Sequence, residues 1–183
     1  MPCSKTSRPD PKSRKKRNLL VPPDIVHNPT VRGGWVEMQF AADATAQGFT
    51  VLRPIALWAA YDFALEYGGG FLRVQVKATS KYTWSVFGAD CKRQTRSGRR
   101  PYDPSEVDFI AAYVADLRTW YLIPIHDVLA VNSILRLDPS NEARSRKLER
   151  FRDGWRRLRR RALRRRPNTR PRTSSAARLA SGV

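Results

Sequence analysis

The sequence has few of the residues on which many enzyme and metal sites depend. Its 183 residues include two cysteines, Cys3 and Cys91, and two histidines, His27 and His126. The cysteines are far apart and lack metal-site spacing, which argues against a zinc module and for a reducing compartment. With two histidines, Ser-His-Asp triads, histidine-dependent nuclease sites and histidine-rich metal centres are poor candidates.

Long apolar runs and phosphate-binding glycine loops are also missing. The basic N-terminus is not followed by an apolar stretch, and no apolar run approaches the length that crosses a bilayer. The glycines at 68–70 precede an expected strand rather than a helix, so they are turn residues and not a nucleotide-binding loop. We therefore expect a soluble, intracellular protein that does not act at a membrane.

Positive charge is abundant and unevenly distributed. The formal charge is +19, with +6 in residues 1–18, zero in 19–135 and +13 in 136–183. The length suits one domain with a proper core. A neutral body with two cationic arms suits a polyanion, so nucleic acid is the first candidate partner and the cytoplasm, in association with the nucleoid, is the expected location.

The neutral body predicts an α/β fold. Residues 35–47 have an apolar stripe at helical spacing with Gly48 as the stop, and Glu37 lies on that stripe, facing the sheet. Expected strands lie at 49–52, within 61–79 (two strands), and at 82–88, 107–115, 120–123 and 134–137, with a short helix at 125–129.

The stretch Tyr61 to Thr79 predicts a hairpin turning at the glycines. A two-residue loop at Gly69-Gly70 pairs position 62 with 77, and a four-residue loop pairs it with 75. Both registers bring Asp62, Gln75 and Lys77 to one face, which fits a hydrolytic site built from a metal and a lysine. A three-residue loop would put Asp62 on the other face unless a bulge corrects the register. The alternative is the ordinary polar face of a half-exposed hairpin, with Asp62 and Lys77 as a cross-strand pair.

Two segments rich in basic residues come after the expected hairpin in the sequence. The polar segment 92–100 is expected to be a loop that is either solvated or in contact with DNA. Residues 140–166 predict one long helix, whose narrow apolar seam docks on the chain's own body or on a partner subunit. The basic residues proposed to contact DNA are Lys92, Arg93, Arg96, Arg99, Arg100, Arg156, Arg157, Arg160 and Arg164.

The ordered set Glu37, Asp62, Gln75 and Lys77 resembles the PD-(D/E)XK nuclease superfamily. In that superfamily a helix acid, a strand aspartate and an E-x-K or Q-x-K on the next strand form the site. More narrowly, the sequence is similar to the homing endonucleases associated with group I introns. The matching features, within about residues 30–130, are Gly33-Gly34 before Glu37, Tyr61-Asp62, RVQVK at 73–77, Val107-Asp108 and WYLIP at 120–124.

The resemblance implies a role for each site residue. Asp62, Glu37 and the Val76 carbonyl would ligate Mg²⁺, with Mn²⁺ as an alternative, because hard divalent cations take oxygen ligands. Gln75 would hold the metal or the phosphate through its amide oxygen. Lys77 would orient or deprotonate the attacking water, or steady the pentavalent phosphate. Because Gln75 stands where an acid is commoner, we expect one metal, or a loosely held second.

The resemblance also implies a restriction-endonuclease-like core, a mixed sheet flanked by helices, and a metal-dependent deoxyribonuclease of the homing type. A Holliday-junction resolvase or repair nuclease is one alternative, and a catalytically degenerate nucleic-acid-binding protein is another. Cutting both strands of double-stranded DNA from one site per chain implies a homodimer or homotetramer. The expected organisation is a disordered basic arm (1–30), a nuclease core (31–137), a basic amphipathic helix (138–166) and a disordered tail (167–183).

Overall fold

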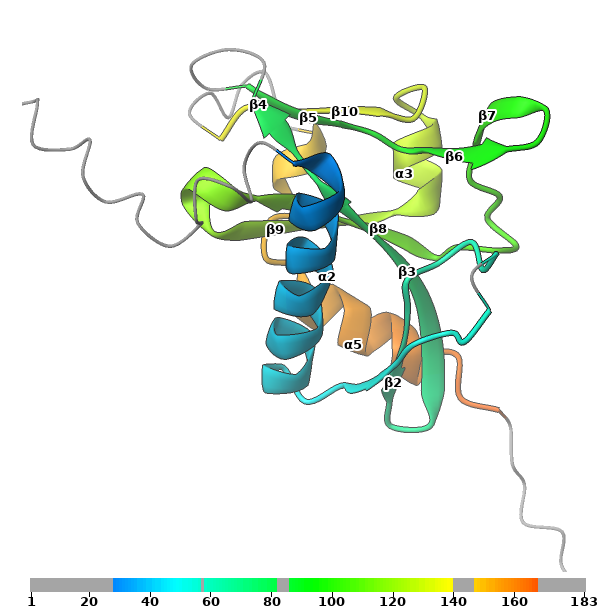
Figure 1. Cartoon of the computed structure of the whole chain (residues 1–183). Coiled ribbons are helices and arrows are strands. Elements are labelled where there is room, and N and C mark those ends of the chain that lie inside the picture. Colours follow the sequence, from blue (N-terminus) through cyan, green and yellow to red (C-terminus); the bar gives the residue numbers. More distant parts are fainter. Residues whose placement is uncertain (1–27, 57, 82–85, 140–146, 168–183) are drawn as a thin grey trace, which may run out of the picture.

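The computed structural model describes residues 28–56, 58–81, 86–139 and 147–167 (Figure 1). The expected N-terminal arm and C-terminal tail lie almost entirely outside the described residues, as do residues 82–85 of one expected strand. The described helices are α2 (Pro29–Ala46), the 3₁₀ helix η2 (Ala115–Leu117), α3 (Ile125–Leu129) and α5 (Trp155–Leu163), and residues 147–149 are also helical. No described helix is long and apolar enough to cross a membrane.

A five-stranded mixed sheet forms the centre of the fold. Its order is β1-β2-β3-β8-β9, in which β3 and β8 are parallel and the other neighbours are antiparallel. The α/β fold class with a mixed sheet is therefore confirmed. The strands are β1 (Thr50–Leu52), β2 (Phe63–Tyr67), β3 (Gly70–Ala78), β8 (Phe109–Val114) and β9 (Thr119–Pro124).

Strands β4 to β7, in the connection between β3 and β8, contribute to two smaller sheets, one of which is completed by β10 from after β9. One has the order β10-β5-β4, from β10 (Ile134–Leu137), β5 (Phe87–Asp90) and β4 (Ser80–Lys81). The other is the hairpin of β6 (Lys92–Thr95) and β7 (Gly98–Pro101). The expectation of a loop over 92–100 is therefore wrong.

Local turn contacts explain the β6–β7 hairpin. The Thr95 hydroxyl donates to the Gly98 carbonyl at 2.6 Å, and Gly98 has φ of +115°, which its missing side chain permits. The hairpin has no apolar face, so hydrophobic alternation could not reveal it.

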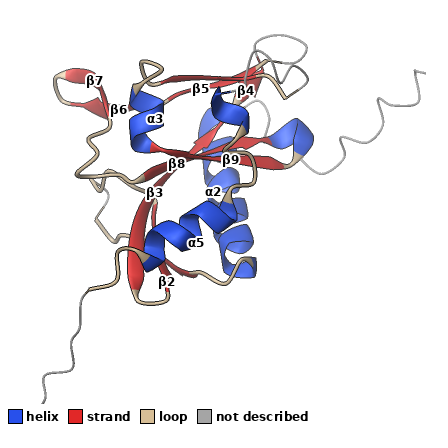
Figure 2. Cartoon of the chain, turned by 180° about the vertical axis from the view of Figure 1, so that it is seen from behind, coloured by secondary structure: helices blue, strands red, loops and turns tan. Residues whose placement is uncertain are grey.

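Each face of the central sheet has its own apolar cluster. On β8, Phe109, Ala111 and Tyr113 pack into one cluster, and the alternate residues Ile110 and Ala112 pack into the other. This explains why both the odd- and the even-numbered residues of β8 are apolar. Helices α2 and α5 cover the first face, whereas α3, β5 and β10 cover the second (Figures 1 and 2).

Helix α2 begins six residues earlier than expected. The Asn28 side chain accepts hydrogen bonds from the backbone N–H groups of Thr30 and Val31, and Pro29 occupies the first turn, so the start is capped. Glu37 therefore lies in the third turn, where the helix dipole no longer accounts for an acid.

The single long helix expected over 140–166 is wrong. Residues 140–146 lie outside the described residues, and the helix that contains 147–149 ends before α5 begins. Between them Asp153 has φ of +45°, and its N–H donates to the Trp120 carbonyl at 2.7 Å. Leu122 N–H donates to the Phe151 carbonyl at 3.0 Å. The chain leaves the helix because its backbone pairs with the edge of β9.

The apolar seam of this region is buried in the chain's own core. Trp155, Leu158 and Ala162 pack into the cluster beneath α2, and Leu148 and Phe151 pack into the opposite cluster. The sequence left open whether the seam docks on the chain's own body or on a partner subunit, and in the structure it docks on the chain's own body.

Candidate active site

The register of β2 and β3 brings Asp62 to the polar face of β3. Phe63 pairs with Val74 and Tyr67 with Gly70, so position 62 falls opposite 75. The turn is two residues, Gly68-Gly69, with φ of +58° and +84°, the conformation that favours glycine in a tight hairpin. The register is the one expected from a four-residue loop, although the loop itself is shorter.

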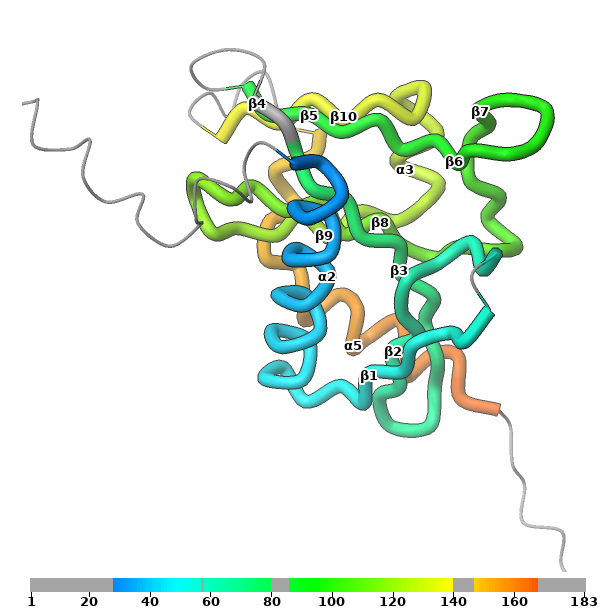
Figure 3. Tube along the Cα trace, viewed as in Figure 1, coloured from blue at the N-terminus to red at the C-terminus, as the bar shows by residue number. Residues whose placement is uncertain are grey.

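The Asp62 carboxylate is fixed by two hydrogen bonds from β3. Its Oδ2 accepts the Val76 N–H at 2.7 Å and the Gln75 Nε2 at 2.6 Å. The chain returns to β3 just before β2 begins (Figure 3), and the Asp62 N–H donates to the Val74 carbonyl at 3.0 Å, so Asp62 lies beside β3 at the start of β2. The carboxylate thus occupies the place that a continuing β2 backbone would take.

The environment of Asp62 raises its pKa to about 6. Burial is the main cause, since it disfavours the charged carboxylate, and the negative charge of Glu37 acts in the same direction. The hydrogen bonds from Val76 and Gln75 and the charge of Lys77 lower the pKa but do not offset burial. The ionised form of Asp62 is therefore disfavoured in its buried position.

Glu37 faces the site from α2. Its carboxylate forms an ion pair with Arg53 at 2.7 Å, and its side chain is 24% exposed. The effect of its charge on the pKa of Asp62 shows that the two carboxylates share one electrostatic environment. The helix acid therefore lies within electrostatic range of the strand acid.

The Val76 carbonyl is directed to the same place. The N–H and C=O of one strand residue point to the same edge, and the Val76 N–H points to Asp62. The carbonyl accepts from Gln75 Nε2 at 3.3 Å. One NH₂ group thus bridges the Asp62 carboxylate and the Val76 carbonyl, two oxygen ligands that converge on a single point.

Lys77 lies on the same face and is held by a residue that the sequence did not reveal. Its Nζ lies 5.2 Å from the centre of the Tyr102 ring, a cation–π distance. Burial raises the pKa of the Tyr102 hydroxyl, and the positive charge of Lys77 partly offsets this. No sequence motif identifies Tyr102. Its only sequence signal was that an aromatic residue follows the basic segment.

Asp108 anchors the start of β8 beside the site. Its carboxylate binds the Arg73 guanidinium (3.1 Å) and the Arg165 guanidinium (2.7 Å), and also accepts the Arg73 N–H at 2.8 Å. Burial pulls the pKa of Asp108 upward, but the hydrogen bonds and charges of the two arginines outweigh it, so the pKa lies below its usual value. Asp108 is thus a structural anion for two arginines.

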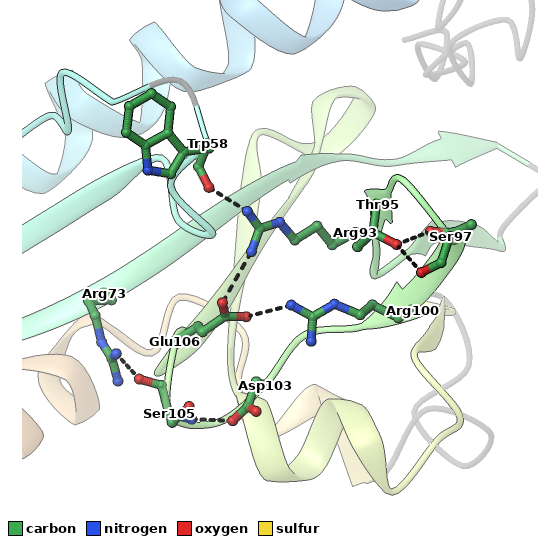
Figure 4. Close-up of polar contacts among 10 residues, drawn as sticks. Trp58, Arg73, Arg93, Thr95, Ser97, Arg100, Asp103, Ser105 and Glu106 are labelled. Carbon is green, nitrogen blue, oxygen red and sulfur yellow. Dashed lines mark hydrogen bonds and ion pairs between the residues drawn. The ribbon is translucent and has the colours of Figure 1, made fainter.

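The basic residues expected in the segment 92–100 fall into two groups. Arg93 bridges the Glu106 carboxylate and the Trp58 carbonyl, and Arg100 also binds Glu106 (Figure 4). Arg99 pairs with Asp90 at 2.9 Å. Lys92 and Arg96 have no ion pair with any described acid. Three of the five side chains therefore hold the hairpin in place.

The arginines expected to contact DNA on the last helix lie in or next to α5. Arg156, Arg157, Arg160 and Arg164 are exposed, and all four line one groove with further arginines. They are separate from the cluster of Asp62, Gln75 and Lys77.

The carboxylate count of the site is low. Within the described part of the chain, no three His, Cys, Asp or Glu side chains converge where they could hold a metal ion by themselves. Gln75 occupies the place of a further acid, so Asp62 and Glu37 are the site's carboxylates, and backbone and amide oxygens would complete any ligand set.

Comparisons with known proteins agree with this geometry. Among curated proteins, nothing matches the chain. Among solved structures, the chain is similar to a bacterial homing endonuclease, I-Ssp6803I, with 25% identity and a TM-score of 0.65 over 74% of this chain and 95% of that one. Residues 27–158 match the family model of the PD-(D/E)XK endonucleases. The chain therefore belongs to the PD-(D/E)XK endonuclease family.

Proposed function

We propose that this endonuclease hydrolyses phosphodiester bonds of double-stranded DNA with Mg²⁺, in the manner of a homing endonuclease. The observation that carries the proposal is the convergence of the Asp62 carboxylate and the Val76 carbonyl on one NH₂ group of Gln75. Two oxygens that share one donor where β2 begins beside β3 suit a hard divalent cation. The raised pKa of Asp62 supports this, because a bound cation would stabilise the ionised carboxylate that burial disfavours.

Each side chain has a proposed role. Asp62, Glu37 and the Val76 carbonyl would hold Mg²⁺, and the Gln75 amide oxygen would hold the metal or the phosphate. The ion would neutralise charge on the phosphate and activate water. Lys77, fixed against Tyr102, would orient or deprotonate the attacking water or steady the phosphate.

We also propose that the chain acts as a homodimer or homotetramer, since one site per chain must cut two strands. The apolar seam at 148–162 is buried within the chain, so the subunit interface would use another surface. Light scattering on the purified full-length chain measures the subunit number directly, and a monomer at the concentration that cuts DNA would contradict the oligomer.

Nicking assays test the proposed activity. Supercoiled plasmid, pooled genomic fragments and a four-way junction are incubated with Mg²⁺ or EDTA and with the wild type, Asp62→Ala or Lys77→Ala. Lys147→Ala, an exposed lysine outside the site, is the matched control. We expect metal-dependent cutting by the wild type and the control and none by the two site variants.

The other outcomes separate the alternatives. Preference for the junction over linear DNA would favour a resolvase, and preference for one long duplex site favours a homing enzyme. Cutting that survives both site substitutions would place the chemistry elsewhere. Absence of cutting together with tight, salt-sensitive binding would show a catalytically degenerate DNA-binding protein.

A further inference from the structure

A groove of about 670 Å³ lies between α5 and the beginning of α3. In Figure 2, α3 lies above and α5 below the strands β8 and β9, whose ends form the floor. Six arginines of the helix and the residues just after it line the groove: Arg156, Arg157, Arg160, Arg161, Arg164 and Arg165. The groove therefore presents a dense array of positive charge in a concave surface.

The acids of the groove are already neutralised. Asp108 binds Arg73 and Arg165, and Asp127 binds Arg150. Among the described residues, no acid forms an ion pair with four others of its arginines: Arg156, Arg160, Arg161 and Arg164. Like charges placed this close in one helix repel each other, so the groove is built for an anion that it does not itself contain.

The arginines are held in place by packing on the opposite side of the helix. Trp155, Leu158 and Ala162 are at most 7% exposed and fix α5 against the sheet. This docking fixes which face of α5 carries the arginines before any ligand arrives, so the backbone of the helix need not be ordered on binding.

We propose that this groove binds the sugar–phosphate backbone of duplex DNA, at phosphates beside the bond that is cut. Guanidinium groups bind phosphates through two parallel hydrogen bonds, which suits arginine better than lysine. From Arg156 to Arg165 the helix rises about 14 Å, comparable with about four base-pair steps. A membrane surface fits less well, because Leu163 is the one large apolar residue that α5 exposes.

The position of the groove allows one duplex to reach both sites. Asp108, at the groove, binds Arg73, which precedes Gln75 by two residues on the same face of β3. Two residues of strand span about 7 Å. This inference rests on the proposed DNA substrate but not on cleavage, so its test measures binding in EDTA.

The test compares two double variants of the full-length chain. Arg160→Gln with Arg164→Gln removes two charges from the groove. Arg118→Gln with Arg136→Gln removes two exposed charges outside it and serves as the control. Kd for a duplex of about 30 base pairs is measured against salt concentration, after thermal melts show that both variants are folded.

We expect the slope of log Kd against log salt to fall by about 1.8 in the groove variant, about 0.9 for each lost phosphate contact, and to change little in the control. Ethylation interference across the duplex should identify phosphates whose modification weakens wild-type binding but not binding by the groove variant. This result would support the groove even if the chain never cuts DNA.

Three outcomes would overturn the proposal. The first is a groove variant with the slope of the control. The second is absence of duplex binding by the wild type. The third is a groove variant that loses binding to anionic phospholipid vesicles while duplex binding is unchanged.

Discussion

The ammonium group of Lys77 lies 5.2 Å from the centre of the Tyr102 ring, and Tyr102 is 5% exposed. Tyr102 comes from the segment between β7 and β8, whereas Lys77 belongs to β3, so the contact joins the basic hairpin region to the central sheet. A long lysine side chain loses much of its rotational freedom against a buried ring. Tyr102 is therefore a positioning residue for the lysine of the candidate site.

Replacing Tyr102 with leucine should lower the single-turnover cleavage rate about 2- to 30-fold. A cation–π contact contributes about 0.5–2 kcal/mol, and each 1.36 kcal/mol in the barrier changes a rate tenfold. The Kd for DNA should stay unchanged, which distinguishes a loss of Lys77 positioning from a loss of DNA binding. Tyr102→Phe keeps the ring and should retain most of the rate; if both variants lose equal activity, the hydroxyl matters and not the ring.

The alternation of apolar and polar residues along β3 was sufficient to predict the polar face of the site. Leu72, Val74 and Val76 are buried, and Arg73 and Gln75 point to the other face, because successive strand residues alternate. The predicted short helix at 125–129 and strand at 134–137 are confirmed residue for residue. Local patterns succeeded where one face of an element is apolar and the other is not.

Long-range pairing was beyond the sequence pattern. The apolar spacing through 148–162 continues across the break, so it predicted one helix, although Gly154 was a sign of a stop. The break depends on Asp153 and Phe151 pairing with β9, more than twenty residues away in the chain. In the same way, the sequence predicted Arg93 and Arg100 as DNA contacts, because it could not show that both pair with Glu106 from another segment.

The stability of the metal-free protein should depend on pH through Asp62. Its folded pKa, about 6, lies above its ordinary value of 3.8. The protonated form is therefore favoured by folding, and the ionised carboxylate opposes folding above pH 6. The penalty should be about 3 kcal/mol at pH 7 and disappear as pH falls to about 4.

Urea denaturation of the wild type and Asp62→Asn in EDTA measures this penalty. The difference in free energy of unfolding should be large at pH 7, with the variant more stable, and should shrink between pH 6 and 4. Other titrating groups cancel in the difference. A gap that is independent of pH would show that Asp62 has an ordinary pKa.

Asp108→Asn should destabilise the fold by about 3–5 kcal/mol, because it leaves two arginines without their buried carboxylate. The Asp108 side chain is 3% exposed and binds both Arg73 and Arg165. Its lowered pKa means that the carboxylate stabilises the fold above about pH 4 and loses this effect as pH falls further.

The control for Asp108 is Glu106→Gln, since Glu106 also binds two arginines but is 35% exposed. Exposed pairs of this kind contribute about 0–1 kcal/mol. Chemical denaturation at pH 7 compares the two variants. Equal losses would mean that burial does not determine the contribution of Asp108.

Gly70→Ala should destabilise the protein by at least about 2 kcal/mol, because no space exists for a methyl group there. A Cβ on Gly70 would lie 1.9 Å from the Ala162 carbonyl oxygen, so α5 would have to move away from the start of β3. Gly33→Ala is the matched control: nothing lies within 4 Å of its Cβ, and it is inside α2, so alanine should stabilise the helix by about 0.5–1 kcal/mol. Urea midpoints of the two variants should therefore move in opposite directions. If Gly70→Ala unfolds at the wild-type midpoint, α5 is not packed against the β2–β3 turn, and the groove that its arginines line would lose its fixed wall.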